Sequence, residues 1–125
     1  MARGYGLITG CHKGAFMILT RNEEILMLAV LRLKDNAYGV TIIREVEKRT
    51  GKKLKFGGLW VSMDNLAKKG LVEKRMADPE PRRGGKSKCY YNLTGQGLNA
   101  LKDTAELQSR LWKGVPRLME GVEES

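Results

Sequence analysis

The side chains of this chain that are best suited to chemistry are its lysines and arginines, and their spacing favours the binding of a polyanion. The segment 44–88 contains 14 Lys and Arg against 6 Asp and Glu, which gives +8 of the formal net charge of +9. Each phosphate that such a surface neutralises releases counterions, so clustered positive charge provides affinity for nucleic acid. We therefore expect nucleic acid to be the main partner.

The remaining reactive side chains do not assemble into a catalytic or metal site. His12 is the only histidine, and with Cys11 it offers a metal two ligands at most. The run 85–87 matches the end of a P-loop, but Glu80 stands where that motif needs its first glycine. We expect no enzymatic activity, no cofactor and no metal. No run approaches the roughly 20 apolar residues of a membrane span. Cys11 and Cys89 form no disulfide framework and fit a reducing cytosol, so with nucleic acid as the partner we expect a cytoplasmic, nucleoid-associated protein.

Start and stop signals divide the first 70 residues into three helices. Thr20 and Glu23 have the spacing of a capping box, which predicts a first helix that runs to about Leu33. The centre of this helix, 25–31, is apolar all round, as in helices that are covered on more than one face. The next two helices are expected over 39–50 and 56–69, separated by a short basic turn.

After Gly70 the apolar period changes from 3.6 to about 2, which indicates β-strands. These strands are expected over 71–75 and 89–93, joined by an exposed Pro- and Gly-rich loop over 78–87. Thr94 then caps a last helix that runs to about Gly114, with Pro116 as a kink or a stop. The order of elements predicts a mainly α chain with a small β-hairpin: a winged helix-turn-helix with a C-terminal dimerisation helix. The expected segments are a flexible arm (1–16), a DNA-binding domain (17–93), and the dimerisation helix and tail (94–125).

Three motifs together resemble the PadR-type transcriptional regulators. The segment 35–42 is similar to the family's Tyr-Gly signature at the second helix, and 58–72 to its recognition helix and first wing strand. The segment 83–94 is similar to the wing, the second strand and the cap of the last helix. The resemblance covers about residues 20–113. It implies a homodimeric DNA-binding repressor whose last helix packs against the partner and which often responds to a small ligand near that interface.

In a winged fold the third helix enters the major groove and the hairpin tip lies beside it. Lysine and arginine would contact phosphates, whereas Ser62 and Asn65 have the chemistry to reach base edges. The chain differs from the family at Trp60, which is usually Tyr, and at Val61, Ser62 and Asn65, which are often Arg or Thr. The expected DNA-binding residues are Tyr38, Lys53, Lys55, Gly58, Trp60, Val61, Ser62, Asn65, Lys68, Arg82, Arg83, Lys86 and Lys88.

Several of these residues have a second interpretation. Tyr38 touches a phosphate, as the family implies, or it is a partly buried aromatic staple. Trp60 contacts the sugar-phosphate backbone, or it fills the core beside Tyr90 and Tyr91. Each lysine taken singly is equally well explained as part of a solvated surface, whereas the cluster favours binding.

A heptad pattern over 98–119 predicts a dimer, with Gln108 as its one polar member. The alternative is one amphipathic helix folded back on its own domain. The expected dimerisation residues are Ile25, Leu28, Leu98, Leu101, Ala105, Leu111, Trp112 and Val115. Trp112 is also the candidate to stack on a small aromatic effector, although a tryptophan in such a seam more often serves packing.

The sequence therefore predicts a dimer that binds a specific double-stranded DNA operator and regulates transcription, as a repressor released by a small ligand. The alternative is a ligand-sensing or protein-interaction module of the same fold without DNA binding. A third interpretation, binding of RNA or single strands, needs a sheet face with exposed aromatics. Tyr90 and Tyr91 alternate along one strand, so only one of them can point outward.

Overall fold

The computed structural model describes residues 17–77 and 88–124, which contain five α-helices, one short 3₁₀ helix and a two-stranded hairpin. In chain order these are α1 (Arg21–Leu33), η1 (Lys34–Asn36), α2 (Gly39–Thr50), α3 (Phe56–Lys68), β1 (Val72–Met76), β2 (Cys89–Leu93), α4 (Gly95–Trp112) and α5 (Val115–Glu124). The chain divides into two compact units. One is Leu19–Asn99, and the other combines the chain up to Ile18 with the residues from Ala100 onward. The expected mainly helical fold with a small hairpin is confirmed.

The start of α1 is fixed by the capping box that the sequence predicts. The Glu23 backbone N–H donates to Thr20 Oγ1 at 3.2 Å, and the Thr20 N–H donates to the Glu23 carboxylate at 2.9 Å. Met27 and Val30 are buried inside the unit, while other apolar residues of this helix remain partly exposed. The mixed burial agrees with a helix that is apolar on every side.

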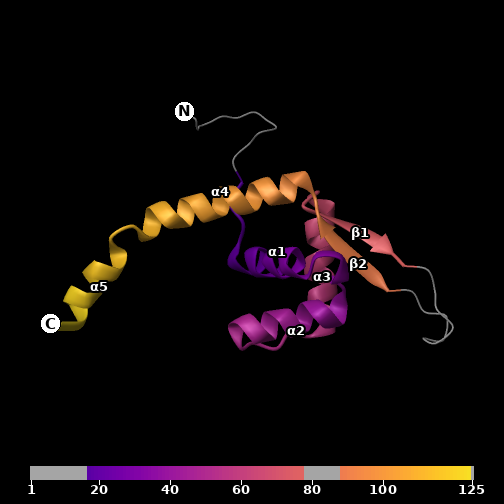
Figure 1. Ribbon diagram of the computed structural model, residues 1–125, viewed down its shortest axis with the longest axis horizontal. Coiled ribbons are helices and arrows are strands. Elements are labelled where there is room, and N and C mark those ends of the chain that lie inside the picture. Colours follow the sequence, from indigo (N-terminus) through magenta and orange to yellow (C-terminus); the bar gives the residue numbers. More distant parts are fainter. Residues whose placement is uncertain (1–16, 78–87, 125) are drawn as a thin grey trace. The chain divides into compact units, whose positions relative to one another are not determined.

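The helices α2 and α3 lie beside α1, with the hairpin adjoining them (Figure 1). Gly51, in the left-handed conformation with φ 78°, ends α2 where the sequence predicts. Gly70, also with φ 78°, follows α3, which is one residue shorter than expected. The short turn between Gly51 and Phe56 therefore brings α3 directly after α2, as in a helix-turn-helix.

The antiparallel hairpin pairs Val72 with Leu93 at one end and Met76 with Cys89 at the other. β1 begins one residue later than expected because the backbone of Leu71 still belongs to the turn that follows α3. Its N–H donates to the Leu66 carbonyl at 3.0 Å, and the Leu71 side chain is fully buried. A backbone hydrogen bond joins β2 to the residues just before α2: the Tyr91 N–H donates to the carbonyl of Ala37 at 2.8 Å.

The core of the 19–99 unit consists of apolar side chains from α1, α2, α3, both strands and the turns next to them. Those with at most 1% of their surface exposed include Met27, Ile42, Met63, Leu66, Leu71 and Tyr91. Burial of such side chains provides the main stabilisation, about 1.5–3 kcal/mol for each large one. The same side chains fix the directions in which α2, α3 and the hairpin present their outer surfaces.

The last part of the chain differs from the expected single helix. α4 ends at Trp112, and the break lies at Gly114, whose φ of 79° few other residues tolerate. Pro116 neither kinks nor stops the helix, because it is the second residue of α5, where no backbone N–H is needed. The heptad pattern over 98–119 is therefore divided between two helices. None of the helices in the described ranges is long and apolar enough to cross a membrane.

Candidate nucleic-acid interface

The helix α3 carries two opposite stripes of residues. Its inner stripe, Leu59, Met63 and Leu66, is at most 2% exposed. Because each residue turns the helix by about 100°, positions two residues further along lie on the opposite side. The residues of the outer face of α3 that the sequence predicts to contact DNA are Gly58, Val61, Ser62, Asn65 and Lys68. All of these are exposed except Ser62, which is half-buried.

The basic turn before α3 places its lysines at the start of this helix. Lys53 and Lys55 are both exposed. Lys55 is the N-cap residue, and its carbonyl accepts the Leu59 N–H at 2.9 Å, but no side chain caps the first turn. The helix start therefore combines free N–H groups, the positive end of the helix dipole and two ammonium groups. This combination favours an anion.

Tyr38 lies half-buried at the start of α2, in contact with the hairpin. Its ring meets that of Tyr90 edge-on, with centroids 5.3 Å apart, and the ammonium of Lys88 lies 4.2 Å from the Tyr38 ring centroid. The Tyr38 N–H donates to Thr41 Oγ1 at 2.9 Å, which fixes the helix start. Tyr38 is thus a partly buried aromatic residue, as one of its two interpretations expects. Its contact with a phosphate stays a prediction.

Arg75 belongs to the same cluster, although the sequence analysis did not select it. Its guanidinium carbon lies 4.8 Å from the centroid of the Tyr90 ring, and the two residues are partners in the strand register. The sequence does indicate that Lys74 and Arg75 point to opposite faces of the hairpin, because side chains alternate along a strand. Only the register, which the sequence does not fix, shows that Arg75 meets an aromatic ring.

Trp60 and Phe56 pack at the junction of α2 and α3. A side chain at Gly39 would meet the Phe56 ring at 3.2 Å and the Trp60 ring at 3.6 Å. The Trp60 ring also lies 6.2 Å from that of Tyr91, yet 39% of its surface is exposed. Trp60 therefore contacts the core with one edge, and its contact with a DNA backbone stays a prediction.

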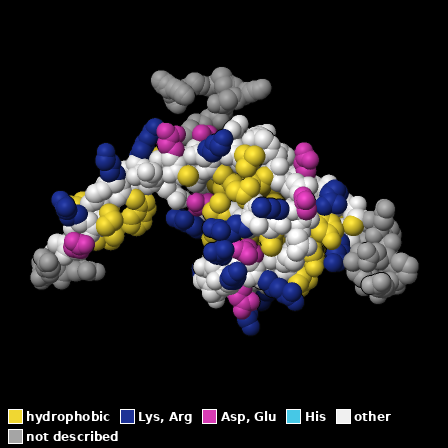
Figure 2. Space-filling view, in the orientation of Figure 1, with side chains coloured by type: hydrophobic (Ala, Val, Ile, Leu, Met, Phe, Trp, Pro, Cys, Tyr) yellow, Lys and Arg dark blue, Asp and Glu magenta, His cyan; other side chains and the backbone are white. Residues whose placement is uncertain are grey.

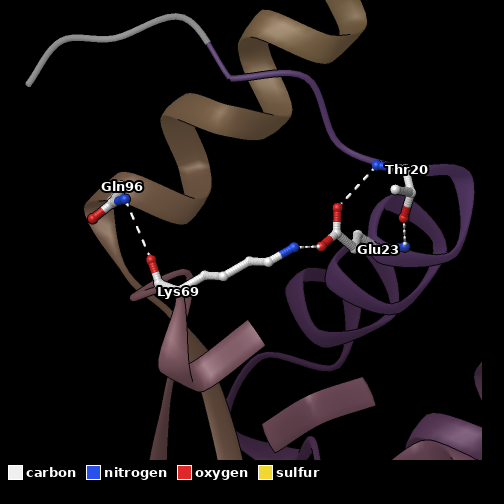
Figure 3. A network of polar contacts seen from close by, with 4 residues as sticks. All are labelled: Thr20, Glu23, Lys69 and Gln96. Atoms are coloured by element: carbon white, nitrogen blue, oxygen red, sulfur yellow. Dashed lines mark hydrogen bonds and ion pairs between the residues drawn. The ribbon is translucent and has the colours of Figure 1, made fainter. Parts of the chain in front are cut away.

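The network in Figure 3 ties the starts of α1 and α4 to the end of α3. Glu23 accepts the Thr20 N–H and forms an ion pair with Lys69, whose carbonyl accepts from Gln96 Nε2 at 3.4 Å. Burial alone would raise the pKa of Glu23. The ion pair with Lys69 and the hydrogen bonds with Thr20 outweigh it and hold that pKa below its ordinary value.

Other acidic residues near the interface are also paired. Asp64, the only acid of α3, forms an ion pair with Lys74 on β1, and this hydrogen bond raises the pKa of Lys74. On α2, the hydrogen bond from Arg49 at 2.8 Å lowers the pKa of Glu45. Figure 2 shows the result for one face: Lys and Arg side chains crowd over the region of α2, with acidic groups scattered among them. The surface therefore keeps a positive excess.

Arg82, Arg83 and Lys86, expected at the tip of the wing, lie outside the described residues. Lys88, at the base of the wing, is the one expected wing residue whose place is described, and it joins the Tyr38 cluster. Burial, and then the neighbouring Cys89, raise the pKa of Tyr91 well above its ordinary value. Within the described ranges, no three His, Cys, Asp or Glu residues come together to hold a metal ion.

The residues expected at a dimer interface differ in exposure. Leu101 is buried, and Ile25 and Val115 are half-buried. The other five residues are exposed. The exposed fraction lies between 38% and 65% for Leu28, Leu98, Leu111 and Trp112, and Ala105 is exposed as well. Figure 2 shows hydrophobic side chains gathered over α5 and the segment that leads into it. The unit that contains the residues from Ala100 onward, called the second unit below, thus exposes large apolar side chains: Leu111, Trp112, Leu118 and Met119.

Comparison with known proteins places the chain among transcriptional regulators. The model of the transcriptional regulator PadR-like family matches residues 27–103. No curated protein matches the chain significantly.

Solved structures agree with the family match. A complex structure of hsRosR-S1 is 30% identical, with 85% of this chain and 87% of that chain covered and a TM-score of 0.61. A PadR family regulator from Eggerthella lenta is 26% identical, covering 80% and 85% of the two chains with a TM-score of 0.63. A PadR family regulator from Clostridium difficile is also 26% identical, covering 80% and 96% with a TM-score of 0.55.

Proposed function

Because the chain belongs to the PadR-like family of transcriptional regulators, we propose that it is a non-enzymatic homodimer that binds specific double-stranded DNA. In this proposal it represses transcription in the cytoplasm, on nucleoid DNA, until a small ligand releases it. The observation that carries the proposal is the outer face of α3, an exposed stripe opposite a fully buried one, with lysines at both ends. A helix that is fixed along one side and free along the other is suited to enter a groove.

The dimensions and charges fit duplex DNA. An α-helix with its side chains is about 10–12 Å wide and the major groove about 12 Å, so α3 can enter it. Lys53 and Lys55 would then contact phosphates at the start of α3, and Lys68 those at its end. The Tyr38 ring, held by Tyr90 and Lys88, would meet the phosphate backbone beside the groove.

A salt titration tests duplex binding. The affinity of the full chain for a fluorescently labelled duplex is measured by anisotropy at several salt concentrations. We expect log affinity to fall linearly with log salt, with a slope of about −0.9 for each phosphate neutralised. A slope near zero, or no binding, would favour the module of the same fold that has no DNA-binding role.

The dimer is proposed from the exposed apolar side chains of the second unit. Leu111 and Leu118 are 65% and 69% exposed, and Trp112 is 53% exposed, which is unusual for a tail that stays in water. Two subunits related by a two-fold axis would place their α3 helices in half-sites about 10–10.5 bp apart, or a multiple of that spacing. Sedimentation equilibrium tests the dimer: Leu111→Glu should dissociate it, whereas Lys113→Glu should not.

The effector is proposed to be a planar aromatic molecule that stacks on Trp112. The chain contains only Trp60 and Trp112, so Trp60→Phe leaves Trp112 as the single fluorescent tryptophan. Addition of 1-naphthoate, a planar aromatic probe whose negative charge disfavours intercalation into DNA, should quench this fluorescence and weaken binding of the wild-type chain to the duplex. Quenching with no change in duplex affinity would contradict release by a ligand.

A further inference from the structure

The centre of the outer face of α3 is apolar, although it is exposed. Val61 is 63% exposed, and Asn65 follows it one helical turn later. Valine is a poor helix former, and at an exposed position it gains little from packing. Packing within the fold does not require a valine here, and its exposed methyl groups are available to a partner outside the chain.

The neighbouring aromatic rings, Phe56 and Trp60, are half-exposed but lie at the side of this face. Phe56 and Trp60 are turned toward α2, where they lie around the position of Gly39. Asp64, which would repel DNA, is paired with Lys74 at the side of the helix. Val61 is thus left as the apolar side chain at the middle of the face, between Gly58 in the first turn and Lys68 in the last.

The chemistry of this face favours an A·T pair. Guanine is read mainly by arginine or lysine, and α3 has neither before Lys68 in its last turn. The apolar group that bases present in the major groove is the C5-methyl of thymine, which suits the two methyls of Val61. Asparagine can bind adenine through its N6 and N7 positions, and Asn65 lies about 6 Å further along the helix than Val61. Both side chains can thus reach the same or neighbouring base pairs.

We propose that Val61 packs against the C5-methyl of a thymine in each half-site and, together with Asn65, makes α3 select A·T at the centre of its footprint. This inference rests on the proposed binding of duplex DNA. It makes Val61 a specificity-determining residue, whereas the lysines of the interface supply affinity for any sequence.

The experiment begins with duplexes selected by the wild-type chain from a random library, and by Val61→Ala in parallel. The wild-type duplexes should share an A·T pair at one position where the Val61→Ala duplexes show a weaker preference, because Asn65 can still read adenine. That thymine is then replaced by deoxyuridine, which removes only the methyl. Wild-type affinity should fall about four-fold, the equivalent of about 0.8 kcal/mol for one buried methyl-sized group. Val61→Ala, whose shorter side chain keeps a single methyl, should lose most of this four-fold ratio.

Lys68→Ala serves as the matched control, since it should weaken binding to both duplexes and keep their four-fold ratio. Val61→Ala places a better helix former at an exposed position, so its fold should be retained, which circular dichroism checks. Equal wild-type affinity for the thymine and uracil duplexes, or selection of G·C at the Val61-dependent position, would overturn the inference while leaving duplex binding intact. Failure to enrich or bind any duplex would overturn the proposed function and this inference together.

Discussion

The starts of α3 and α4 both contain glycines, but only α4 has one, Gly97, that is packed tightly against other parts of the protein. A Cβ at Gly97, in the first turn of α4, would lie 2.2 Å from the carbonyl oxygen of Leu71 and 3.2 Å from Met27 Cε. A Cβ at Gly57 or Gly58, in the first turn of α3, would meet nothing within 4 Å. The first glycine is required by the protein's own packing. Packing within the protein does not require Gly57 or Gly58, so we infer that they let a partner approach the start of α3 closely.

The capping of the two helices shows the same contrast. At α4, Thr94 Oγ1 accepts the Gly97 N–H at 2.9 Å and donates to the Gly70 carbonyl at 2.6 Å, and the Thr94 N–H donates to the Leu71 carbonyl at 3.1 Å. At α3, the N-cap Lys55 provides no side-chain hydrogen bond. The start of α4 is thus satisfied internally, while that of α3 leaves its N–H groups to solvent or a ligand.

The largest effect is expected at the crowded start. Gly97→Ala should lower the free energy of unfolding by about 3 kcal/mol, because a backbone carbonyl cannot move aside as a flexible side chain can. Urea unfolding followed by circular dichroism measures this. Gly95→Ala is the matched control at the same helix start, where a Cβ meets nothing within 4 Å. Equal free energies of unfolding for the two variants would show that Gly97 is not required by its contact with the Leu71 carbonyl.

At the open start, stability and binding should change in opposite directions. The double variant Gly57→Ala/Gly58→Ala should raise the free energy of unfolding by about 1 kcal/mol, since alanine favours the helix. The added methyls would keep a DNA backbone at a greater distance, so affinity for a duplex should fall about ten-fold, or about 1.4 kcal/mol. Urea unfolding and fluorescence anisotropy measure the two quantities. Unchanged affinity would show that no close approach occurs at these glycines.

The sequence predicts most local elements because their signals lie within a few residues of one another. The Thr20–Glu23 capping box, the stop at Gly51 and the Thr94 cap all depend on spacings of four residues or fewer, and all are confirmed. The sequence predicts the end of the last helix at about Gly114, close to the observed break, but it also predicts a kink or a stop at Pro116, which instead lies in the first turn of α5. Proline is compatible with a first helical turn, so its presence does not distinguish a helix end from a helix start.

Contacts between distant residues could not be predicted in the same way. Gly97 looks like an ordinary flexible position until Leu71 is known to lie against it. The contact of Lys88 with Tyr38 likewise joins residues 50 positions apart, and it depends on where the hairpin packs. The outer face of α3 was predictable, because the buried stripe of Leu59 and Met63 fixes which side is free.

The ion pair between Glu23 and Lys69 also lies among the internal contacts at the start of α4, and its contribution to stability should depend on pH. Because the folded pKa of Glu23 is lowered, its carboxylate stabilises the fold above the ordinary value of 4.5, and this contribution is lost as pH falls through the folded pKa. Glu23→Gln keeps the capping-box hydrogen bond but loses the charge that pairs with Lys69 and with the start of α1, so it should lower the free energy of unfolding by about 1 kcal/mol at pH 7. Thermal unfolding at pH 7 and pH 3 measures the difference, which should shrink at pH 3. A constant difference would assign the effect to packing instead of charge.

The smallest effect is expected at the far end of the outer face of α3. Lys68 is exposed and adds charge without packing, so Lys68→Ala should leave the free energy of unfolding within about 0.5 kcal/mol of wild type. If its ammonium neutralises one phosphate, the slope of log affinity against log salt should decrease in magnitude by about 0.9, equally for every duplex sequence. Lys102→Ala on α4 removes the same charge from another exposed position and should leave the slope unchanged. Equal slopes for the two variants would mean that net charge attracts the DNA, and that the far end of α3 makes no phosphate contact of its own.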